Sequence, residues 1–448
     1  MGNLGLAIAA SGIDAAQTAM DTIAQNLSNT NTPGYIAETA NISAIASGDP
    51  LGIGGGATVG SVTQNSDSLL AANAAQTSAN AAQSTALQQV LQQAQLAFGN
   101  PSSTTGVGPD LSTFWQSWDQ LAANPSSSAG RQGVVDSAQV VVSDLQQASS
   151  QISTVTANAS SQLAGTITQA NTLLSQVAAL NSQVTAQGAT GSSVSALVDQ
   201  RNQILTQLSS QIGATSRTGS SGAIDVSVGG ITLVQGNWSD TLTLQGSGSS
   251  TQVVAQSTHS VLNAASGSAA GLLAAVNLYL PSYQSQVDTV ANNLATVVNT
   301  QLAAGFTSSG TAGSPLFTGS GAAGLTVNPA VAANPALIAT SASASLPAAT
   351  NDGSNAQALA NLYNSSNGPD AAWQAAVVNV GSQVSEINSQ VQSQTTTANT
   401  AQQNLQAVTG VNQNAALVDL MNFQSTYQAA AKVVTTVDTA LQSLLAAV

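Results

Sequence analysis

Apolar residues recur at alternating intervals of three and four positions at both ends of the chain. The N-terminal series is Leu6, Ala9, Ile13, Ala16, Met20, Ile23 and Leu27, and the C-terminal series is Leu420, Phe423, Tyr427, Ala430, Val434, Val437, Leu441, Leu444 and Val448. This spacing puts two apolar residues in every seven and is typical of the contact line between helices of a coiled coil. We therefore expect one long helix at each end.

The other faces of the C-terminal helix are polar but almost uncharged, and consist of Asn, Gln, Ser and Thr. Charged residues normally flank the contact line of a soluble coiled coil and select its partner. Thr and Asn are mediocre helix formers, so such a segment depends on its neighbours for stability. Two interpretations remain open: a helix pair within one chain, or a helix that becomes fully ordered only in an assembly.

Between the ends, the pattern predicts several helices and one group of strands. Helical spacing covers 66–98, 111–123, 129–187, a segment that ends at Gly213, then 266–303 and 354–408. Alternating residues on both sides of Gly229-Gly230 predict a two-residue hairpin, and DTLTLQG and TQVVAQS continue the strand-like pattern. Residues 304–350 are rich in Gly, Ser, Pro and Ala, with short strand-sized pieces.

These elements predict a mainly α fold with a β-rich portion: long terminal helices pairing as a coiled coil, a helical-bundle body and a small β-rich outer domain. The expected segments are an N-terminal helix with its turn (1–60), a helical body (61–212), a β-hairpin region (213–262), a further body helix (263–303), a small outer β and loop region (304–350), another part of the helical body (351–410) and the C-terminal coiled-coil helix (411–448).

The composition excludes several classes of function. Charged residues make up 5% of the chain, against about 25% in typical domains. Uncharged polar residues replace them, and no run of about 20 apolar residues is present, so we expect no membrane insertion. The basic residues Arg131, Arg201, Arg217 and Lys432 are scattered singly, whereas nucleic-acid binding requires clustered cations. Cysteine is absent, which excludes disulfides and zinc–thiolate sites.

The sequence contains no evident chemical centre. His259 is the single histidine, and Glu38 and Glu386 are the only glutamates. The aspartates at 14, 21, 144, 199, 288, 419 and 438 lie within helical patterns, and we predict that they occupy solvated outer positions. GSGAAG at 319–324 and GIGGG at 52–56 lack the flanking residues of a nucleotide site and are predicted to be loops. We expect no enzyme activity, cofactor or metal.

Both ends of the chain resemble the signatures of the bacterial flagellar axial proteins, which comprise rod, hook and hook-associated members. SGIDAAQTAMDTIAQNLSNTNTPGYIAE (11–38) is similar to the N-terminal signature, and VNQNAALVDLMNFQSTYQAAAKVVTTVDTALQSLLAAV to the C-terminal one. The residues on the N-terminal motif are Ser28, Asn29, Asn31, Thr32, Pro33, Gly34 and Tyr35. FWQSWDQLAANPSSSAGRQGVVDSAQVV, LVDQRNQILTQLSSQIGA and NPALIATSAS resemble hook-associated members, whereas rod and hook proteins are mostly β-rich in this region.

The resemblance implies a structural component of the flagellum that connects hook to filament. It implies the hook protein, a second hook-associated protein, further copies in a ring and an export chaperone as partners. It also implies type III export without a cleaved signal peptide, to an extracellular location, which suits an N-terminus that lacks the positive residues of a secretory signal. The alternatives are a hook or rod subunit, a secreted adhesin or, more remotely, a flagellum-associated muramidase.

We expect the assembly interface to comprise both apolar series and the turn that follows the N-terminal one. Its predicted residues are Leu6, Ile13, Met20, Ile23, Leu27, Asn29, Asn31, Pro33, Gly34, Tyr35, Leu420, Phe423, Tyr427, Val434, Val437, Leu441 and Leu444. Pro33 disfavours helical geometry at Thr32 and Gly34 permits a chain reversal. We expect Tyr35 to dock against a neighbouring subunit. The scarcity of Lys and Glu should also make the packing insensitive to pH, as in an acid-living bacterium.

Overall fold

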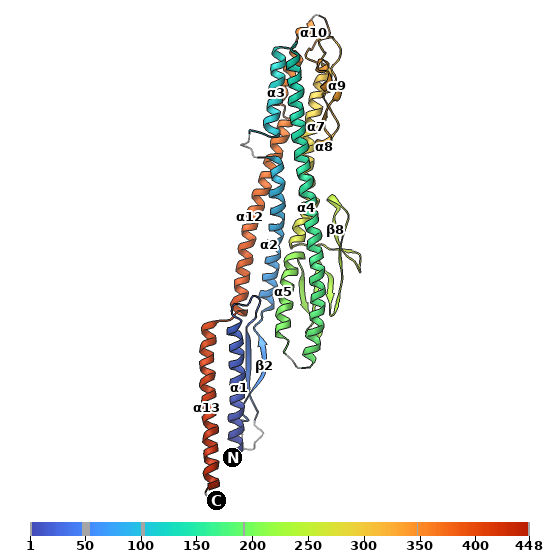
Figure 1. Ribbon diagram of the computed structural model, residues 1–448. Coiled ribbons are helices and arrows are strands. Elements are labelled where there is room, and N and C mark those ends of the chain that lie inside the picture. The colour runs from blue at the N-terminus through green and yellow to red at the C-terminus, as the bar shows by residue number, and fades with distance from the viewer. Residues whose placement is uncertain (1, 47–53, 100–103, 191–192, 347, 447–448) are drawn as a thin grey trace.

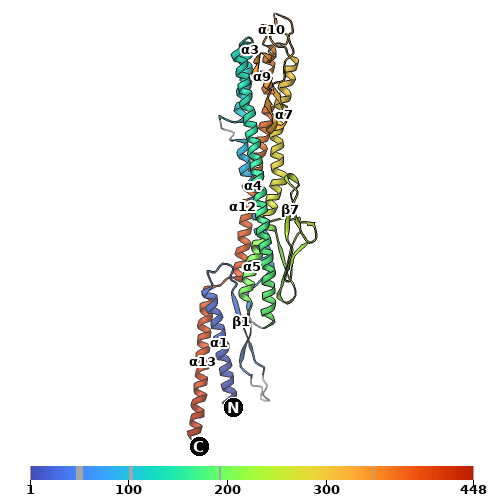
Figure 2. The same ribbon diagram turned by 45° about the vertical axis from the view of Figure 1, so that its right-hand side comes forward.

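The protein is described by a computed structural model that covers residues 2–46, 54–99, 104–190, 193–346 and 348–446. It is an elongated molecule with both termini at one end (Figure 1). That end is formed by helices α1 (Gly2–Ser28) and α13 (Gln413–Ala446) and strands β1 (Glu38–Ala44) and β2 (Ala57–Gln64), which we call the terminal unit. A long helical body extends away from it, and a region of short strands lies on one side of the body (Figure 2).

In the terminal unit, α1 packs along α13, which confirms the predicted pairing of the terminal helices. Gly12 lies at this contact, and a Cβ added there would be 3.9 Å from the Cβ of Ala430. The opposite side of α1 packs against the antiparallel hairpin β1–β2, which contains a bulge between Asn41 and Ile42. The hairpin was not predicted, because most of its residues are exposed and the apolar alternation is therefore weak.

The helical body contains the helices that the apolar spacing predicts. They are α2 (Ser68–Gln95), α3 (Val107–Ala123), α4 (Ser128–Ala189), α5 (Ser195–Ile212), α11 (Ser354–Ala360) and α12 (Pro369–Thr409). The Asp67 side chain caps α2 by accepting from the N–H groups of Leu69 and Leu70, and Gly213, with φ of 66°, ends α5. The expected helix 354–408 is two helices, since the chain turns before Pro369 and α12 starts there.

The expected helix 266–303 is also interrupted. It consists of α6 (Ser268–Ala274), a π-helical turn (Ala275–Tyr279) and α7 (Leu280–Ala304). Pro281 lies just beyond the π turn and has no N–H to donate to the carbonyl four residues earlier. The regular α-helical ladder is therefore already broken at this point, which permits the extra residue of a π turn.

Aromatic side chains fill the body near α3. Phe114, Trp118 and Tyr283 are fully buried, and Phe114 contacts the Trp115, Trp118 and Phe317 rings. The Trp115 Nε1–H donates to the Asp370 carboxylate at 2.7 Å, which joins α3 to α12. The few aromatics in this chain are thus concentrated where α3, α7 and α12 meet.

The β-rich region lies against α4 (Figure 1). Its two antiparallel sheets are ordered β3–β4–β5–β6 and β7–β8–β9. The strands are β3 (Thr215–Thr218), β4 (Ile224–Val228), β5 (Ile231–Gln235), β6 (Trp238–Ser239), β7 (Leu242–Gln245), β8 (Gln252–Ala255) and β9 (Ser260–Val261). Gly229 and Gly230 both have positive φ, at 55° and 85°, so the predicted two-residue hairpin is confirmed.

The segment 305–351 packs on α4 and α7 as short elements. These are β10 (Phe317–Thr318), α8 (Gly321–Gly324), β11 (Thr326–Val327), α9 (Pro329–Ala333) and α10 (Ala348–Asn351), with β10 paired to β11. The sequence GSGAAG forms the connection between the two strands and contains only the single turn α8. GIGGG, the other predicted loop, lies partly outside the described residues.

Three of the aspartates that we predicted to be solvated are not. Asp199 is buried, and Asp144 and Asp288 are half-buried. The Asp288 side chain accepts from the N–H of Ala322 at 2.7 Å, and Asp199 accepts from the side chain of Gln64 at 2.7 Å. These carboxylates satisfy donors of neighbouring segments, which helical spacing alone does not reveal. Within the described part of the chain, no helix combines the length and apolarity that crossing a bilayer requires.

Candidate assembly surface

Helix α13 is open to solvent along its whole described length, and none of its described side chains is buried. On the predicted contact line, Leu420, Phe423, Val434 and Val437 are half-buried against α1, while Tyr427 and Leu441 are 36% and 40% exposed. The side chain of Leu444 lies outside the described residues. The contact line predicted for α13 therefore coincides with its least exposed face.

A second set of apolar side chains on α13 lies outside the predicted series. It comprises Leu417, Val418, Met421, Val433 and Leu445, which are between 46% and 78% exposed. In this chain α13 packs chiefly against α1. The exposed set is therefore apolar surface that the single chain leaves in water, and such surface typically marks an interaction site.

Helix α1 is better covered than α13, because α13 lies on one side and the β1–β2 hairpin on the other. Ile23 is buried, Ile13, Met20 and Leu27 are half-buried, and Leu6 near the free end is 37% exposed. The hairpin itself exposes Ile42, Ile45 and Val62 at 38% to 40%. The terminal unit thus presents apolar side chains from α13 and from the hairpin.

The turn after α1 is tied to the helical body. Gly34 has φ of +78°, as the predicted chain reversal requires. The carbonyl of Pro33 accepts from the Gln203 side chain of α5 at 2.7 Å, and a Cβ at Gly34 would lie 2.4 Å from the same Gln203 Nε2. The backbone conformation therefore favours glycine here, and any larger residue would also displace the Gln203 side chain.

Tyr35 uses its hydroxyl within the chain. The hydroxyl donates to Oδ1 of Asn26 at 2.8 Å, and Asn26 also binds the N–H and C=O of Glu38. Burial, and then the charges of Glu38 and Asp199, raise the pKa of Tyr35 to about 12, so the hydroxyl keeps its proton. The docking of Tyr35 on a neighbouring subunit stays a prediction. Asn31, Pro33 and Gly34 are exposed and Asn29 is half-exposed.

A buried acidic pair lies where the terminal unit meets the body. Glu38 and Asp199 are 8% and 9% exposed. Burial raises the pKa of Asp199 and the charge of Glu38 adds to the rise, while hydrogen bonds from Gln64 and the Ile36 backbone oppose it. The N–H of Ala37 also donates to the carbonyl of Thr409 at 2.8 Å, which links this junction to the end of α12. The terminal unit is therefore attached to the body by specific polar contacts.

Sequence reasoning missed Asn26, Gln64, Asp199 and Gln203, which build this junction. One signal was available for the hairpin, since ATVGSVTQ (57–64) consists mainly of small and β-branched residues and directly follows the glycine-rich GIGGG. No comparable signal marks Gln64 or Gln203. Their partners are a carboxylate and a carbonyl about 130 to 170 residues away along the chain.

Comparisons with known proteins place the chain in a family. Residues 91–317 match the model for the flagellar hook-associated protein FlgK helical domain, and residues 6–35 match that for the flagella basal body rod protein. No curated protein matches the chain. The solved structure of the flagellar hook junction protein FlgK from Burkholderia pseudomallei is 18% identical, with a TM-score of 0.65, and the match covers 77% of this chain and 100% of that one.

At that identity the solved structure supports the fold alone, whereas the helical-domain model covers about half of the sequence, including α3, α4 and α5 in full. The rod-protein match covers most of α1 and the turn at Gly34 and Tyr35. Both matches agree with the long terminal helices and the helical body. The chain belongs to the FlgK family of flagellar hook-associated proteins.

Proposed function

We propose that this hook-associated protein is the adaptor that joins hook to filament, with its terminal unit in the inner wall of the tube. The observation that carries this proposal is the exposure of α13, a long helix whose large apolar side chains are left uncovered by its own chain. Covering a Leu, Met or Val side chain completely contributes about 1.5–3 kcal/mol, so neighbouring subunits would gain much from packing here.

The scarcity of charge in the terminal unit favours the same role. Within the described residues, α13 carries Asp419, Lys432 and Asp438, and all three are exposed. Moving unpaired charges out of water is costly, so a helix surrounded by protein on several sides must carry few of them. A solvated coiled coil would instead place charges beside its contact line.

The partners follow from this arrangement. The terminal unit would contact the hook protein below, a second hook-associated protein above and further copies of this chain around the ring. The protein would leave the cell through the type III export apparatus without cleavage of a signal peptide, with a chaperone covering the apolar C-terminal helix. The family resemblance supports these partners and this route, and the open face of α13 gives them a physical basis.

Electron microscopy of flagella from cells lacking this chain tests the proposal. We expect hooks without filaments, and filament protein shed into the medium. Complementation with a chain truncated before residue 411 should fail, because α13 is removed while the helices of the body remain. Normal filaments on the hooks of the deletion strain would overturn the junction role.

A second experiment separates the junction role from that of a hook or rod subunit. Purified protein should bind to the ends of isolated hooks and should not polymerise into long tubes by itself. Adhesion assays with the truncated chain address the adhesin alternative, since an adhesin would keep its binding without residues 411–448. Wall-hydrolysis assays with Asp→Asn variants address enzyme activity, which the family, a structural one, does not suggest.

A further inference from the structure

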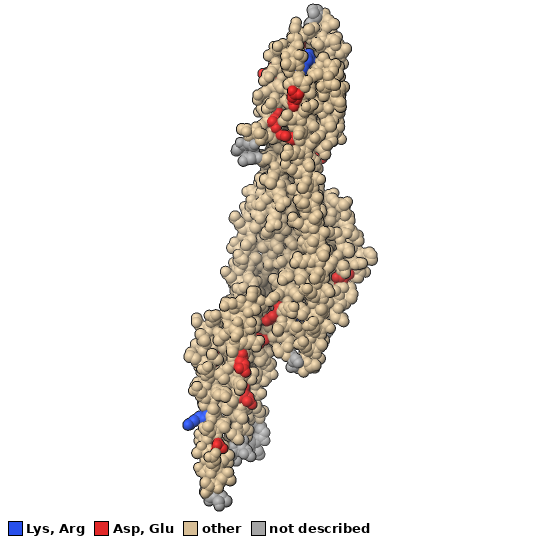
Figure 3. Space-filling model, viewed as in Figure 1, with Lys and Arg blue, Asp and Glu red and all other residues tan. Residues whose placement is uncertain are grey.

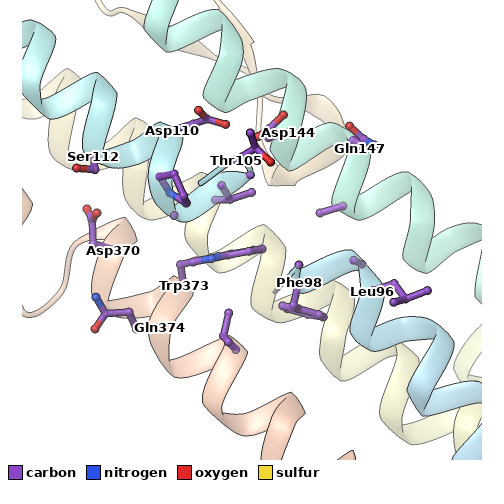
Figure 4. Close-up of a pocket in the computed structure, with 18 of the residues that line it drawn as sticks. Leu96, Phe98, Thr105, Asp110, Ser112, Asp144, Gln147, Asp370, Trp373 and Gln374 are labelled. Atoms are coloured by element: carbon purple, nitrogen blue, oxygen red, sulfur yellow. The ribbon is translucent and has the colours of Figure 1, made fainter. Parts of the chain in front are cut away.

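A cavity of about 860 Å³ opens on the side of the helical body where α3, α4 and α12 meet the end of α2 (Figure 4). Its floor contains Phe98 and Trp373, which stack with ring centroids 5.6 Å apart and are 4% and 7% exposed. The volume lies within the range of about 300–1,000 Å³ that is typical of binding sites. The cavity is remote from the terminal unit and takes no part in the assembly surface described above (Figure 1).

The rim of this cavity is unusually apolar for an exposed surface. Leu96, Tyr363 and Val378 are 74%, 48% and 70% exposed. They come from three separate segments, the 3₁₀ turn after α2, the 3₁₀ turn 361–364 and α12. Three large apolar side chains at one opening form a patch rather than isolated exposed residues, and such patches mark sites of interaction.

One wall of the cavity is acidic. The side chains of Asp110 of α3 and Asp144 of α4 both line it (Figure 4). Burial raises the pKa of Asp144 to about 7, and its contact with Asp110 adds to the rise. The other ionisable groups facing the cavity are Asp370 of α12, which accepts from Trp115, and Tyr363 on the rim. No Lys, Arg or His is among the described residues that line it.

We propose that this cavity is a docking groove for a segment of another protein that carries a Lys or Arg beside apolar side chains. The basic group would lie against the carboxyl groups of Asp110 and Asp144. The apolar side chains would cover the floor and the rim. The acidic pair and the apolar rim thus recognise complementary parts of one amphipathic segment.

The exposed rim favours a polypeptide over a small molecule. A compound that filled only the floor would leave Leu96 and Val378 in water, whereas a chain lying across the opening would cover both. A second copy of this protein is poorly suited as the occupant. Within the described residues its exposed basic side chains are Arg217, which lies 3.6 Å from Asp225, and Lys432 on α13. Most of the face of the molecule shown in Figure 3 is uncharged, with scattered acidic and basic groups.

The test uses the full chain and a fluorescent peptide of alternating Leu and Lys as the probe, measured by anisotropy at pH 8 and pH 6. Peptides of alternating Leu and Glu, and of alternating Ser and Lys, should bind at least about tenfold more weakly, because each lacks one of the two recognised features. Asp144→Asn should weaken binding of the Leu–Lys peptide roughly tenfold. Its amide resembles the protonated carboxyl, so the fold should be retained. Val378→Ser, at an exposed site, should weaken binding roughly fivefold.

Two variants serve as matched controls. Asp136→Asn removes the same charge from an exposed position on α4, and Leu69→Ser removes an equally exposed apolar side chain from α2. Both should bind the peptide like the unaltered chain. Wild-type binding should weaken from pH 8 to pH 6, because burial raises the pKa of Asp144 to about 7 and its carboxyl gains a proton over this range. Asp144→Asn should lose this dependence. Equal effects of Asp136→Asn and Asp144→Asn would overturn the proposal. So would self-association of the free chain that Asp144→Asn abolishes, because the occupant would then be a second copy.

Discussion

Within the part of the chain that the structure describes, five asparagines on helices bind both the N–H and the C=O of one residue at or next to the start of a strand. The pairs are Asn26 with Glu38, Asn171 with Leu242, Asn181 with Ile224, Asn277 with Thr251, and Asn299 with Phe317. A side-chain amide supplies both donor and acceptor without a charge. In a chain with 5% charged residues, these amides therefore attach the strands to the helices.

Asn181 is the most buried of these five asparagines, which we call clamps, and its side chain makes four hydrogen bonds. It donates to the carbonyls of Ile224 and Gly236, at 2.8 Å each, and accepts from the Ile224 N–H and the Arg201 guanidinium. We expect Asn181→Ala to lower the free energy of unfolding by about 2–4 kcal/mol, because several buried partners would be left unsatisfied. Urea unfolding followed by circular dichroism measures this.

Gln162→Ala provides the control for that measurement, since Gln162 is exposed on the same helix. It should change the free energy of unfolding by less than about 0.5 kcal/mol. A similar loss for both variants would mean that helix α4 itself, and not the clamp, determines the effect. The clamp was in principle visible in the sequence, because Asn181 interrupts the apolar stripe between Val177 and Val184. A polar residue at such a position signals a buried hydrogen-bond partner, although not which one.

At the scale of elements, the helical spacing of apolar residues predicted the long helices of the body. The bounds of α2, α3, α4 and α5 agree with expectation to within a few residues, since each has a continuous apolar stripe. The β1–β2 hairpin was missed because its strands are mostly exposed. The breaks before Pro369 and at the π turn near Pro281 were missed because helical spacing continues on both sides of them. The residues predicted for the contact line of α13 include its least exposed side chains, but the exposed apolar face of this helix was not recognised.

The two faces of α13 allow a direct separation of folding from assembly. Phe423 is half-buried against α1, whereas Met421 is 61% exposed. We expect Phe423→Ala to destabilise the terminal unit by roughly 1–3 kcal/mol, less than for a fully buried ring. Met421→Ser should leave the monomer unchanged and weaken binding to isolated hooks. Hydrogen exchange of α1 and α13 measures the first effect, and cosedimentation with hooks measures the second.

Val433→Ser repeats the test about three helical turns further along the exposed face. If both serine variants bind hooks normally while their export is unchanged, the exposed face is not the assembly surface, and the proposal for α13 must be abandoned. The next candidates for the interface are then Asn31 and Pro33, which are exposed in the turn, and the exposed apolar side chains of the β1–β2 hairpin.

At the scale of the whole molecule, the buried aspartates make the folded state more stable at mildly acidic pH than above pH 7. Burial raises the pKa values of Asp144, Asp199 and Asp370, that of Asp144 to about 7. The folded state therefore binds these protons more tightly than the unfolded chain, whose Asp groups titrate near 4. Stability then rises as the pH falls from about 7 towards 4, and it is lower above 7. The scarcity of other titratable groups leaves little to oppose this trend.

We therefore expect the midpoint of thermal unfolding to rise by a few degrees from pH 8 to pH 5. Below about pH 4 the trend should reverse, because hydrogen bonds from Ser354 and Ser341 lower the pKa of Asp352 to about 2 and its stabilisation is lost as it gains a proton. Asp144→Asn and Asp199→Asn should each flatten the rise, while Asp136→Asn, at an exposed site, should not. Thermal scans by circular dichroism at fixed ionic strength measure all four chains. Helix content that collapsed between pH 7 and pH 4 would contradict this account, because the buried carboxyls would then be stabilising the folded state as charged groups.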